Sequence, residues 1–235
     1  MDFKSMQAPN VTVLSGRVAP LETGLPSAID KRPIEGKIWL GPEGLSGDQQ
    51  ADKKHHGGSE RALHLYPLEH YHYWQQRYPE SSGFSPGAFG ENLSASGFAE
   101  NTVCIGDIFQ LDEAVIQVSQ PRSPCFKLNH SFMRSDMALT VQINGHGGYL
   151  FRVLTPGHVH PEARMSLLAR QWPELTVREV AWRFFNDPLN KAFLSRLSEC
   201  EVLSESWQSK VRQRLQSGLV EDWNKRLFGF MDLPE

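Results

Sequence analysis

The sequence predicts a mainly β protein: a β-barrel with inserted helices, followed by a small C-terminal module of three helices. Two observations lead to this fold class. Short apolar segments bounded by glycine, proline and acidic residues recur through residues 1–163, as expected for many short strands. From residue 164 onward the apolar residues recur at helical spacing instead. We therefore divide the chain into a barrel domain, 1–163, and a helical module, 164–235.

The strands of the barrel domain are predicted from alternating or continuous apolar residues. Asp112 and Glu113 separate two of these segments, which predicts a hairpin or a bulged pair. Pro67 is expected to begin a helix over residues 68–78, because proline suits the first helical turn. The predicted strands cover residues 11–18, 37–40, 62–66, 102–111, 115–119 and 149–154.

The helical module begins with Thr176-x-x-Glu179, a capping box that predicts a helix start. Asp187-Pro188 introduces a second helix, and Gly218 is expected to end a third. The apolar stripes of these helices form either the module's own core or a contact within a homodimer, and both interpretations stay open. The stripes consist of Val177, Val180, Ala181, Phe184, Phe185, Leu189, Phe193, Leu197, Trp207, Val211 and Leu215.

Composition argues against several classes of protein. The formal net charge is −3, which argues against a protein that coats nucleic acid. The sequence contains neither an apolar run long enough to cross a bilayer nor a signal-peptide pattern. The three cysteines are far apart and form no CxxC pair, so a secreted disulfide framework is not expected. These features predict a protein of the reducing cytoplasm that binds neither nucleic acid nor membranes.

Cys125 is the first candidate functional residue, because it follows a strand in the segment P-R-S-P-C. Pro121 and Pro124 cannot donate ladder hydrogen bonds, so the strand over 115–119 is expected to end and release the thiol at the barrel rim. Arg122 and Lys127 are close in sequence, and neighbouring cations favour the thiolate that attacks electrophiles or binds soft metals. The alternative is a cysteine that only packs. Core packing is expected for the other two cysteines, Cys104 and Cys200.

The polar segment 47–58, which ends in Gly57-Gly58, is the second candidate. Glycines allow a close approach of the backbone to a ligand, and consecutive N–H groups bind anions. Lys53, Lys54 and Arg61 add positive charge suited to a phosphate. Adjacent histidines point in opposite directions along an extended chain, so at most one of His55 and His56 faces a given site. The alternative interpretation is a solvated turn.

Two further glycine-rich segments are less specific. G-A-F-G-E-N-L over residues 87–93 contains Glu91 and Asn92 before an apolar residue, and G-H-G-G over residues 145–148 precedes a predicted strand. Each is explained equally well as a structural turn.

Taken together and in order, these segments resemble one family, the MOSC domain. The resemblance rests on D-x-x-x-D-K-K-H-H-G-G from Asp48, G-A-F-G-E-N-L from Gly87, G-D-I-F from Gly106 and V-S-Q-P-R-S-P-C-F-K-L-N from Val118. It covers nearly the full chain, and the C-terminal helices resemble those of the YiiM-type branch. The resemblance implies a MOSC-type β-barrel that binds a pterin-type molybdenum cofactor.

The same resemblance implies the site residues. Cys125 matches the family cysteine that binds the metal. His56 matches the motif histidine before the two glycines. For Asp48, Glu91 and Asn92, a hydrogen bond to the pterin and a structural loop anchor both stay open. The groups expected around the cofactor are Lys54, His56, Gly57, Arg61, Arg122, Ser123 and Asn129.

The activity implied by the resemblance is the molybdenum-dependent reduction of N-hydroxylated compounds such as hydroxylamino-purines. His56 is the candidate proton donor, because its ordinary pKa is near neutrality, and ordered water is the alternative. The sequence has no iron–sulfur spacing and no dinucleotide fingerprint, so an external flavin or iron–sulfur reductase is expected as electron donor.

Three other functions are considered. The first is a molybdenum-cofactor carrier without turnover, and the second is sulfur transfer through a persulfide on Cys125. The third is a zinc hydrolase that uses His56, Asp48 and Cys125, although these residues lack a recognisable ligand spacing.

Overall fold

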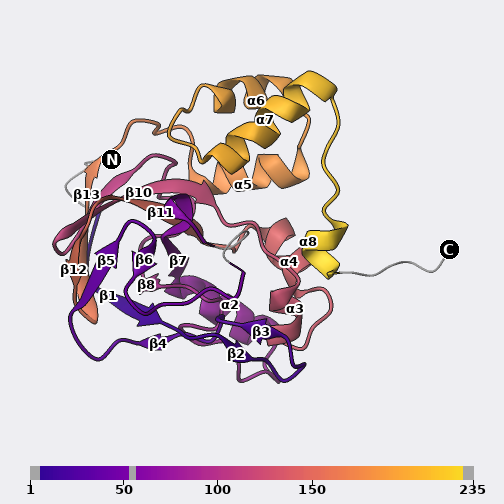
Figure 1. Ribbon diagram of the computed structural model, residues 1–235. Coiled ribbons are helices and arrows are strands. Elements are labelled where there is room, and N and C mark those ends of the chain that lie inside the picture. Colours follow the sequence, from indigo (N-terminus) through magenta and orange to yellow (C-terminus); the bar gives the residue numbers. More distant parts are fainter. Residues whose placement is uncertain (1–5, 53–56, 230–235) are drawn as a thin grey trace.

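A closed seven-stranded barrel forms the centre of the protein (Figure 1). The computed structural model describes residues 6–52 and 57–229. Around the barrel, each strand pairs with the next, and the last pairs with the first. All neighbours are antiparallel except β7 and β8, which are parallel. The order is β1 (Gln7–Ser15), β8 (Leu93–Ala95), β7 (Leu63–Pro67), β11 (Tyr149–Thr155), β10 (Ala114–Pro121), β9 (Ile108–Leu111) and β13 (Glu162–Ala169).

Shorter strands lie outside the closed ring. β4 (Arg32–Pro33) pairs with the end of β1. A separate three-stranded sheet contains β12 (Gly157–Val159), β5 (Ile38–Gly41) and β6 (Gly44–Leu45). A two-stranded ribbon contains β2 (Ala19–Pro20) and β3 (Pro26–Ser27).

The helices fall into three groups. α2 (Leu68–Arg77) follows β7 directly, while α3 (Lys127–Ser131) and α4 (Met137–Asn144) lie between β10 and β11 in sequence. The C-terminal helices α5 (Val177–Asn186), α6 (Lys191–Ser198) and α7 (Glu205–Ser217) pack together on one side of the barrel, as Figure 1 shows. A short α8 (Asn224–Phe228) lies apart from them, beside α4. One 3-10 turn, η2 (Ser59–Arg61), precedes β7.

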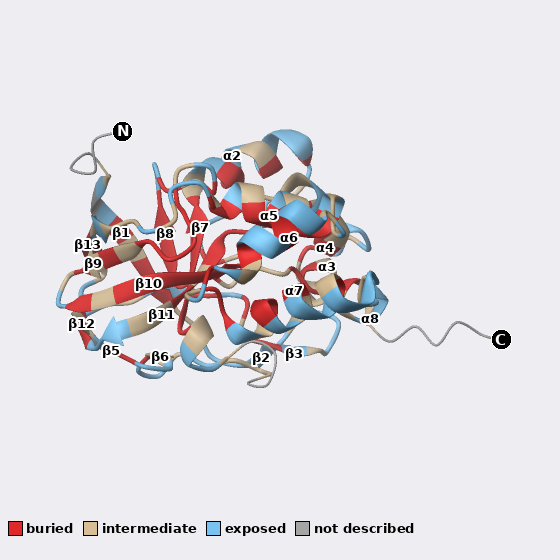
Figure 2. Cartoon of the chain, turned by 90° about the horizontal axis from the view of Figure 1, so that it is seen from above, coloured by how far each residue is buried: buried red, intermediate tan, exposed pale blue. Residues whose placement is uncertain are grey.

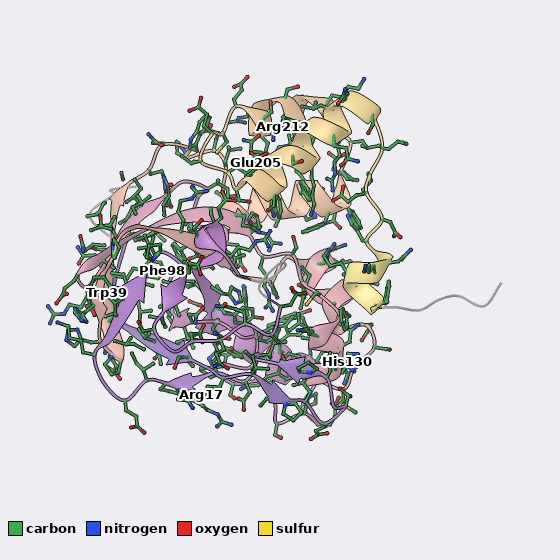
Figure 3. The ribbon with its side chains drawn as sticks, viewed as in Figure 1. Arg17, Trp39, Phe98, His130, Glu205 and Arg212 are labelled. Atoms are coloured by element: carbon green, nitrogen blue, oxygen red, sulfur yellow. The ribbon has the colours of Figure 1, made fainter. Side chains whose placement is uncertain are left out.

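One hydrophobic core continues from the barrel into the helical module. Figure 2 shows β10 and β7 mostly buried, whereas the outward faces of α5, α6 and α7 are exposed. Phe98 and Phe109 fill the barrel, and Phe184 of α5 packs on Trp207 of α7 at a ring-centroid distance of 4.1 Å within the same cluster. Figure 3 likewise shows Phe98 among the barrel strands. The apolar stripes of the module are therefore mostly buried within the chain itself.

The predicted fold class is confirmed, with local corrections. The predicted strand 102–111 is wrong over residues 102–107, because Gly106 takes a φ of +82° in a turn and the strand begins at Ile108. The strand expected to end at residue 119 continues to Pro121, which pairs with Tyr149 across a register shift. The helix predicted over residues 68–78 is present as α2, with Pro67 as its N-cap and the last residue of β7. Leu189 is 43% exposed and lies outside α6.

The predicted division of the chain after residue 163 falls inside β13, whose residues from Met165 to Ala169 pair with β9. The domain boundary itself stays a prediction. Among the described residues, no helix is both long and apolar enough to cross a membrane.

Candidate active site

Cys125 lies in the segment that connects β10 to α3. Residues 122–129, which include this segment and the first residues of α3, are called the cysteine loop below. The loop begins where Arg122 N donates to Gly148 O at 3.1 Å, which ties it to the turn before β11. Leu128 N donates to Cys125 O at 3.0 Å, so Cys125 lies in the turn that starts α3. The thiol is buried, with 8% of the residue exposed. The core packing predicted for Cys104 and Cys200 is confirmed, since both are buried, and burial raises the pKa of each to about 11.

Two guanidinium groups lie within electrostatic range of the Cys125 sulfur. Burial lowers the pKa of Arg122, and the charge of Cys125 acts against this effect. Burial also lowers the pKa of Arg226, to about 10, and Cys125 again opposes the shift. Arg122 is in the predicted motif, whereas Arg226 comes from α8, about a hundred residues further along the chain. Cations beside a thiol are the setting in which thiolate chemistry is found.

Arg122 carries a buried donor without a partner. Its Nη1 atom is shielded from solvent and has no hydrogen-bond partner in the part of the chain that the structure describes. The guanidinium is within electrostatic range of Tyr66, Tyr71 and Glu91 as well as Cys125. A buried unsatisfied donor costs about 1–3 kcal/mol, more when it is charged. An acceptor atom from a bound ligand or an ordered water would satisfy this donor.

More positive charge gathers where the barrel meets the helical module. Arg61 donates from Nη2 to Ser206 Oγ at 2.8 Å, and burial lowers its pKa. Burial also lowers the pKa of Lys210; Glu221 opposes this, and neighbouring guanidiniums lower the pKa further. Glu221 is itself bound by Arg214 at 2.9 Å. A site with this charge balance favours an anionic ligand. The cations involved are Arg61, Arg122, Lys210, Arg214 and Arg226.

Glu91 is surrounded by protein donors. Its carboxylate is fully buried and accepts hydrogen bonds from Tyr71 Oη, Gly87 N, Phe89 N and Ser94 Oγ. The Gly87 N–H lies 2.6 Å from one carboxylate oxygen. Gly87 has a φ of +97°, and a Cβ there would lie 2.0 Å from Lys31 O, so this turn requires glycine. These contacts are those of a loop anchor.

Asp48 and Asn92 are bound to the same part of the barrel. Asp48 forms a buried ion pair with Lys31, with Nζ 2.5 Å from both carboxylate oxygens, and accepts from Gly16 N at 2.8 Å. Asn92 donates from Nδ2 to Asp48 Oδ2 at 3.0 Å and accepts from His64 N at 3.3 Å. Lys31, Asp48, Glu91 and Asn92 are called the internal polar network below.

A second set of buried titratable groups surrounds the G-H-G-G turn. Glu100 accepts from Gly148 N at 2.7 Å and pairs with His70 Nε2 at 2.6 Å. His146 stacks on His70 with ring centroids 4.2 Å apart. Burial, followed by the charge of His70, lowers the pKa of His146 to about 4. This turn therefore holds the start of the cysteine loop in place, because Gly148 O accepts from Arg122 N.

The remaining predicted site residues are placed as follows. Asn129 donates from Nδ2 to Leu227 O at 2.8 Å and accepts from Ala138 N at 2.7 Å, so both ends of its amide contact protein. Ser123 is half-buried within the cysteine loop, and Gly57 is half-buried just before η2. Lys54 and His56 lie outside the described residues. The roles of all these residues toward a cofactor stay predictions.

Sequence reasoning misses Arg226 and Lys210. Both lie in the helical part of the chain, where charged residues normally mark solvent-exposed faces. The only local signal is the basic pair Lys225-Arg226 in a segment too short for a periodic pattern. The proximity of Arg226 to Cys125, and of Lys210 to Arg226, depends on long-range contacts.

The barrel with Cys125 in a loop after β10, joined to three packed helices, corresponds to two known family models. A MOSC domain model matches residues 52–166, and a model of the YiiM-like 3-alpha helix domain matches residues 175–218. The chain belongs to the MOSC domain family, in the branch that carries the YiiM-like helices.

Relatives and solved structures agree with this assignment. Protein YiiM of Escherichia coli (strain K12) is 44% identical over 220 residues, which cover 93% of this chain and 98% of that protein. Its crystal structure matches with a TM-score of 0.81, over 95% of this chain and all of that chain at 39% identity. The crystal structure of YiiM from Geobacillus stearothermophilus matches with a TM-score of 0.75 at 30% identity, over 89% of this chain and 99% of that chain.

One relative is much longer than this chain. A protein named Reductase from Gibberella moniliformis (strain M3125 / FGSC 7600) is 37% identical over 213 residues. The match covers 87% of this chain but only 37% of that protein.

Proposed function

We propose that this protein is a molybdenum-cofactor-dependent reductase of N-hydroxylated small molecules, with hydroxylamino-purines as the leading substrate class. MOSC domains are associated in general with molybdenum-cofactor binding, and one relative is named Reductase. The observation that carries the proposal is buried Cys125 within electrostatic range of both Arg122 and Arg226, with the Nη1 donor of Arg122 lacking a partner among the described residues.

The residues present fit such a cofactor. A thiolate is a suitable ligand for a soft metal, and Cys125 is the residue proposed to bind it. The unpaired N–H of Arg122 suits an acceptor atom of the pterin or its phosphate. Arg61 and Lys210 add the positive charge that a phosphate requires, and Arg226 adds more beside the thiol.

When bound, the molybdenum centre supplies two-electron chemistry that side chains lack. The reaction breaks the N–O bond of a hydroxylamine and consumes two electrons and two protons, giving an amine and water. The chain's own residues bind and orient the reactants and exclude water. A proton donor is also needed. His56 is proposed for that role, with ordered water as the alternative.

The electrons come from outside this sequence, in our proposal from an external flavin or iron–sulfur reductase, because the sequence has no Gly-rich dinucleotide fingerprint and no iron–sulfur spacing. In support, the longer fungal relative has about two-thirds of its length outside the match, which is room for an electron-delivering domain. We further propose a cytoplasmic location and no nucleic-acid or membrane partner. The proposal also includes a homodimer, for which we identify no interface.

The test is elemental and pterin analysis of protein expressed in a host that makes molybdenum cofactor. It is combined with an assay of hydroxylamine reduction driven by a chemical reductant. Wild type and the buried-thiol control Cys104→Ser are expected to contain molybdenum and to reduce the substrate. Cys125→Ser is expected to lose roughly tenfold or more of the metal, because a direct ligand is removed, while remaining folded.

Three results would contradict the proposal. Equal molybdenum content and activity in Cys125→Ser would remove this thiol from the site. Zinc in place of molybdenum would point to a hydrolase. Bound cofactor without conversion of any hydroxylated amine or base would indicate a carrier.

A further inference from the structure

The short helix α8 lies outside both matched family regions, 52–166 and 175–218. It follows an extended segment after α7 and lies beside α4, as Figure 1 shows in yellow. A five-residue helix is not stable by itself, so its position depends on what it contacts. Those contacts are with the cysteine loop, with α4 and with Phe185 of α5, over whose ring the Arg226 guanidinium lies at 5.4 Å from the centroid.

The backbone of α8 is hydrogen-bonded to the cysteine loop on the C-terminal side of Cys125. Phe126 N donates to Arg226 O at 2.7 Å, and Asn129 Nδ2 donates to Leu227 O at 2.8 Å. Leu227 is buried. Gly229, which has a φ of +79°, lies against the ring of Phe126, and a Cβ there would be 3.3 Å from a ring carbon. The part of the cysteine loop that follows Cys125 is therefore in direct contact with α8.

The side chain of Arg226 contacts the loop on the N-terminal side of Cys125. Its Nη1 donates to Pro124 O at 2.5 Å, and its Nη2 donates to Gln142 Oε1 of α4 at 2.6 Å. The planar guanidinium thus spans the loop and the helix behind it. Pro124 O belongs to the peptide group that contains the nitrogen of Cys125, so this bond fixes the peptide plane directly before the cysteine.

We infer that α8 is a clasp that holds the cysteine loop in its cofactor-binding conformation, and that Arg226 is the positioning residue of this clasp. The inference rests on the proposed function for the identity of the ligand. The clasp itself is independent of the proposed function, because hydrogen bonds join α8 to Pro124, Phe126 and Asn129, on both sides of Cys125. Arg226 acts through the backbone and its charge.

Hydrogen exchange of the full-length, cofactor-free protein tests the clasp. Arg226→Gln removes the guanidinium that bonds both Pro124 O and Gln142 Oε1. Backbone amides of residues 122–131 are then expected to exchange roughly tenfold faster, as those of a locally released segment do. Arg226→Lys keeps the charge and one donor without the planar fork, and exchange is expected to be intermediate. Arg212→Gln, an exposed arginine of α7 paired with Glu205, is the matched control and should match wild type.

A second measurement separates positioning from general stability. Molybdenum content per chain is expected to fall in Arg226→Gln and to be partly restored in Arg226→Lys, while the melting temperature and the exchange of barrel amides stay close to wild type. If Arg226→Gln instead accelerates exchange throughout the barrel, Arg226 is a general stabilising residue and the inference is overturned.

Two other results overturn the inference: wild-type exchange in the loop of Arg226→Gln, or undiminished molybdenum in that variant. Wild-type protein without molybdenum would count against the proposed function instead. The exchange comparison then still decides whether α8 clasps the loop.

Discussion

The internal polar network and the cysteine loop both contain buried charged groups, but they differ in whether those groups have hydrogen-bond partners within the protein. In the network, Glu91 accepts four protein donors and Asp48 is paired with Lys31. In the loop, Arg122 keeps a buried N–H without a partner among residues 6–52 and 57–229. Both regions contain residues of the family motifs, so the motifs alone do not distinguish them. Their hydrogen bonds distinguish the region whose charged groups are paired within the chain from the region that we propose binds a ligand.

This difference bears on how motif residues are interpreted. Asp48, Glu91 and Asn92 belong to the motifs, yet their polar atoms bind the chain itself. Their contacts give them a role in shaping the barrel end on which the loop rests. Membership of a motif therefore does not by itself assign a ligand-binding role to a residue, and the pattern of hydrogen-bond partners is needed as well.

The largest expected effect concerns the ion pair of the network. Asp48→Ala leaves Lys31 buried without its counter-charge, and we expect the free energy of unfolding to fall by about 3–5 kcal/mol. Urea unfolding measures the change. Asp30→Ala, which removes an exposed pair with Arg32, is the control and should change it by less than about 0.5 kcal/mol. A small effect of Asp48→Ala would erase the distinction between the two regions.

A pH-dependent effect is expected from His146, next to the turn that holds the loop. Its pKa is about 4 in the folded protein because of burial, below the ordinary histidine value of about 6.5. Between these values the unfolded chain binds a proton that the folded chain does not. The free energy of unfolding therefore falls as the pH falls from about 6.5 to about 4.

His146→Asn should remove about 1–2 kcal/mol of this dependence, after allowance for the partial exposure of the ring. Urea unfolding at several pH values between 7 and 4 checks it, with the exposed His72→Asn on α2 as control. An unchanged pH dependence in His146→Asn would contradict the prediction.

Arg122→Met tests the incomplete region directly. The free energy of unfolding should change by at most about 1 kcal/mol, or even increase, because a buried and only partly satisfied charge is replaced by an apolar chain of similar length. Molybdenum content should fall in the same variant. A strong loss of stability with unchanged metal content would place Arg122 with the structural network instead.

The smallest effect is expected at the surface of the helical module. Glu205 and Arg212 form an exposed ion pair on α7, labelled in Figure 3. Arg212→Ala should change the free energy of unfolding by less than about 0.5 kcal/mol. A thermal melt at low and high salt measures it, and a larger or salt-independent loss would show that exposed charges of this module also carry structure.

Local patterns predict much of this fold. The N-cap half of the predicted capping box is formed, with Glu179 N donating to Thr176 Oγ1 at 3.1 Å, while the Glu179 carboxylate accepts from Arg183. α7 ends at Gly218 with a φ of +66°. The apolar pattern does not predict β13. The consecutive Leu167 and Leu168 interrupt the alternation expected of a strand and resemble the apolar spacing of the helices that follow. It does not predict α8 either, because five residues cannot show a helical period.

The candidate site is predictable only in part, for a similar reason. Arg122 and Cys125 are neighbours in one motif, so their proximity is a local property. Arg226 reaches the same loop through a contact that spans 102 residues. Its role follows from packing, which residue types alone do not specify.

The long span of the contact between Arg226 and Pro124 also sets an order of events during synthesis. The barrel closes only when β13 has been made and has paired with β1, and the peptide plane before Cys125 is fixed only once residue 226 has left the ribosome. A nascent chain that already contains every residue of the cysteine motif therefore still lacks the contact that fixes this peptide plane. Under the proposed function, cofactor loading would follow translation of the C-terminal helices, and chains that stall before residue 226 would load poorly.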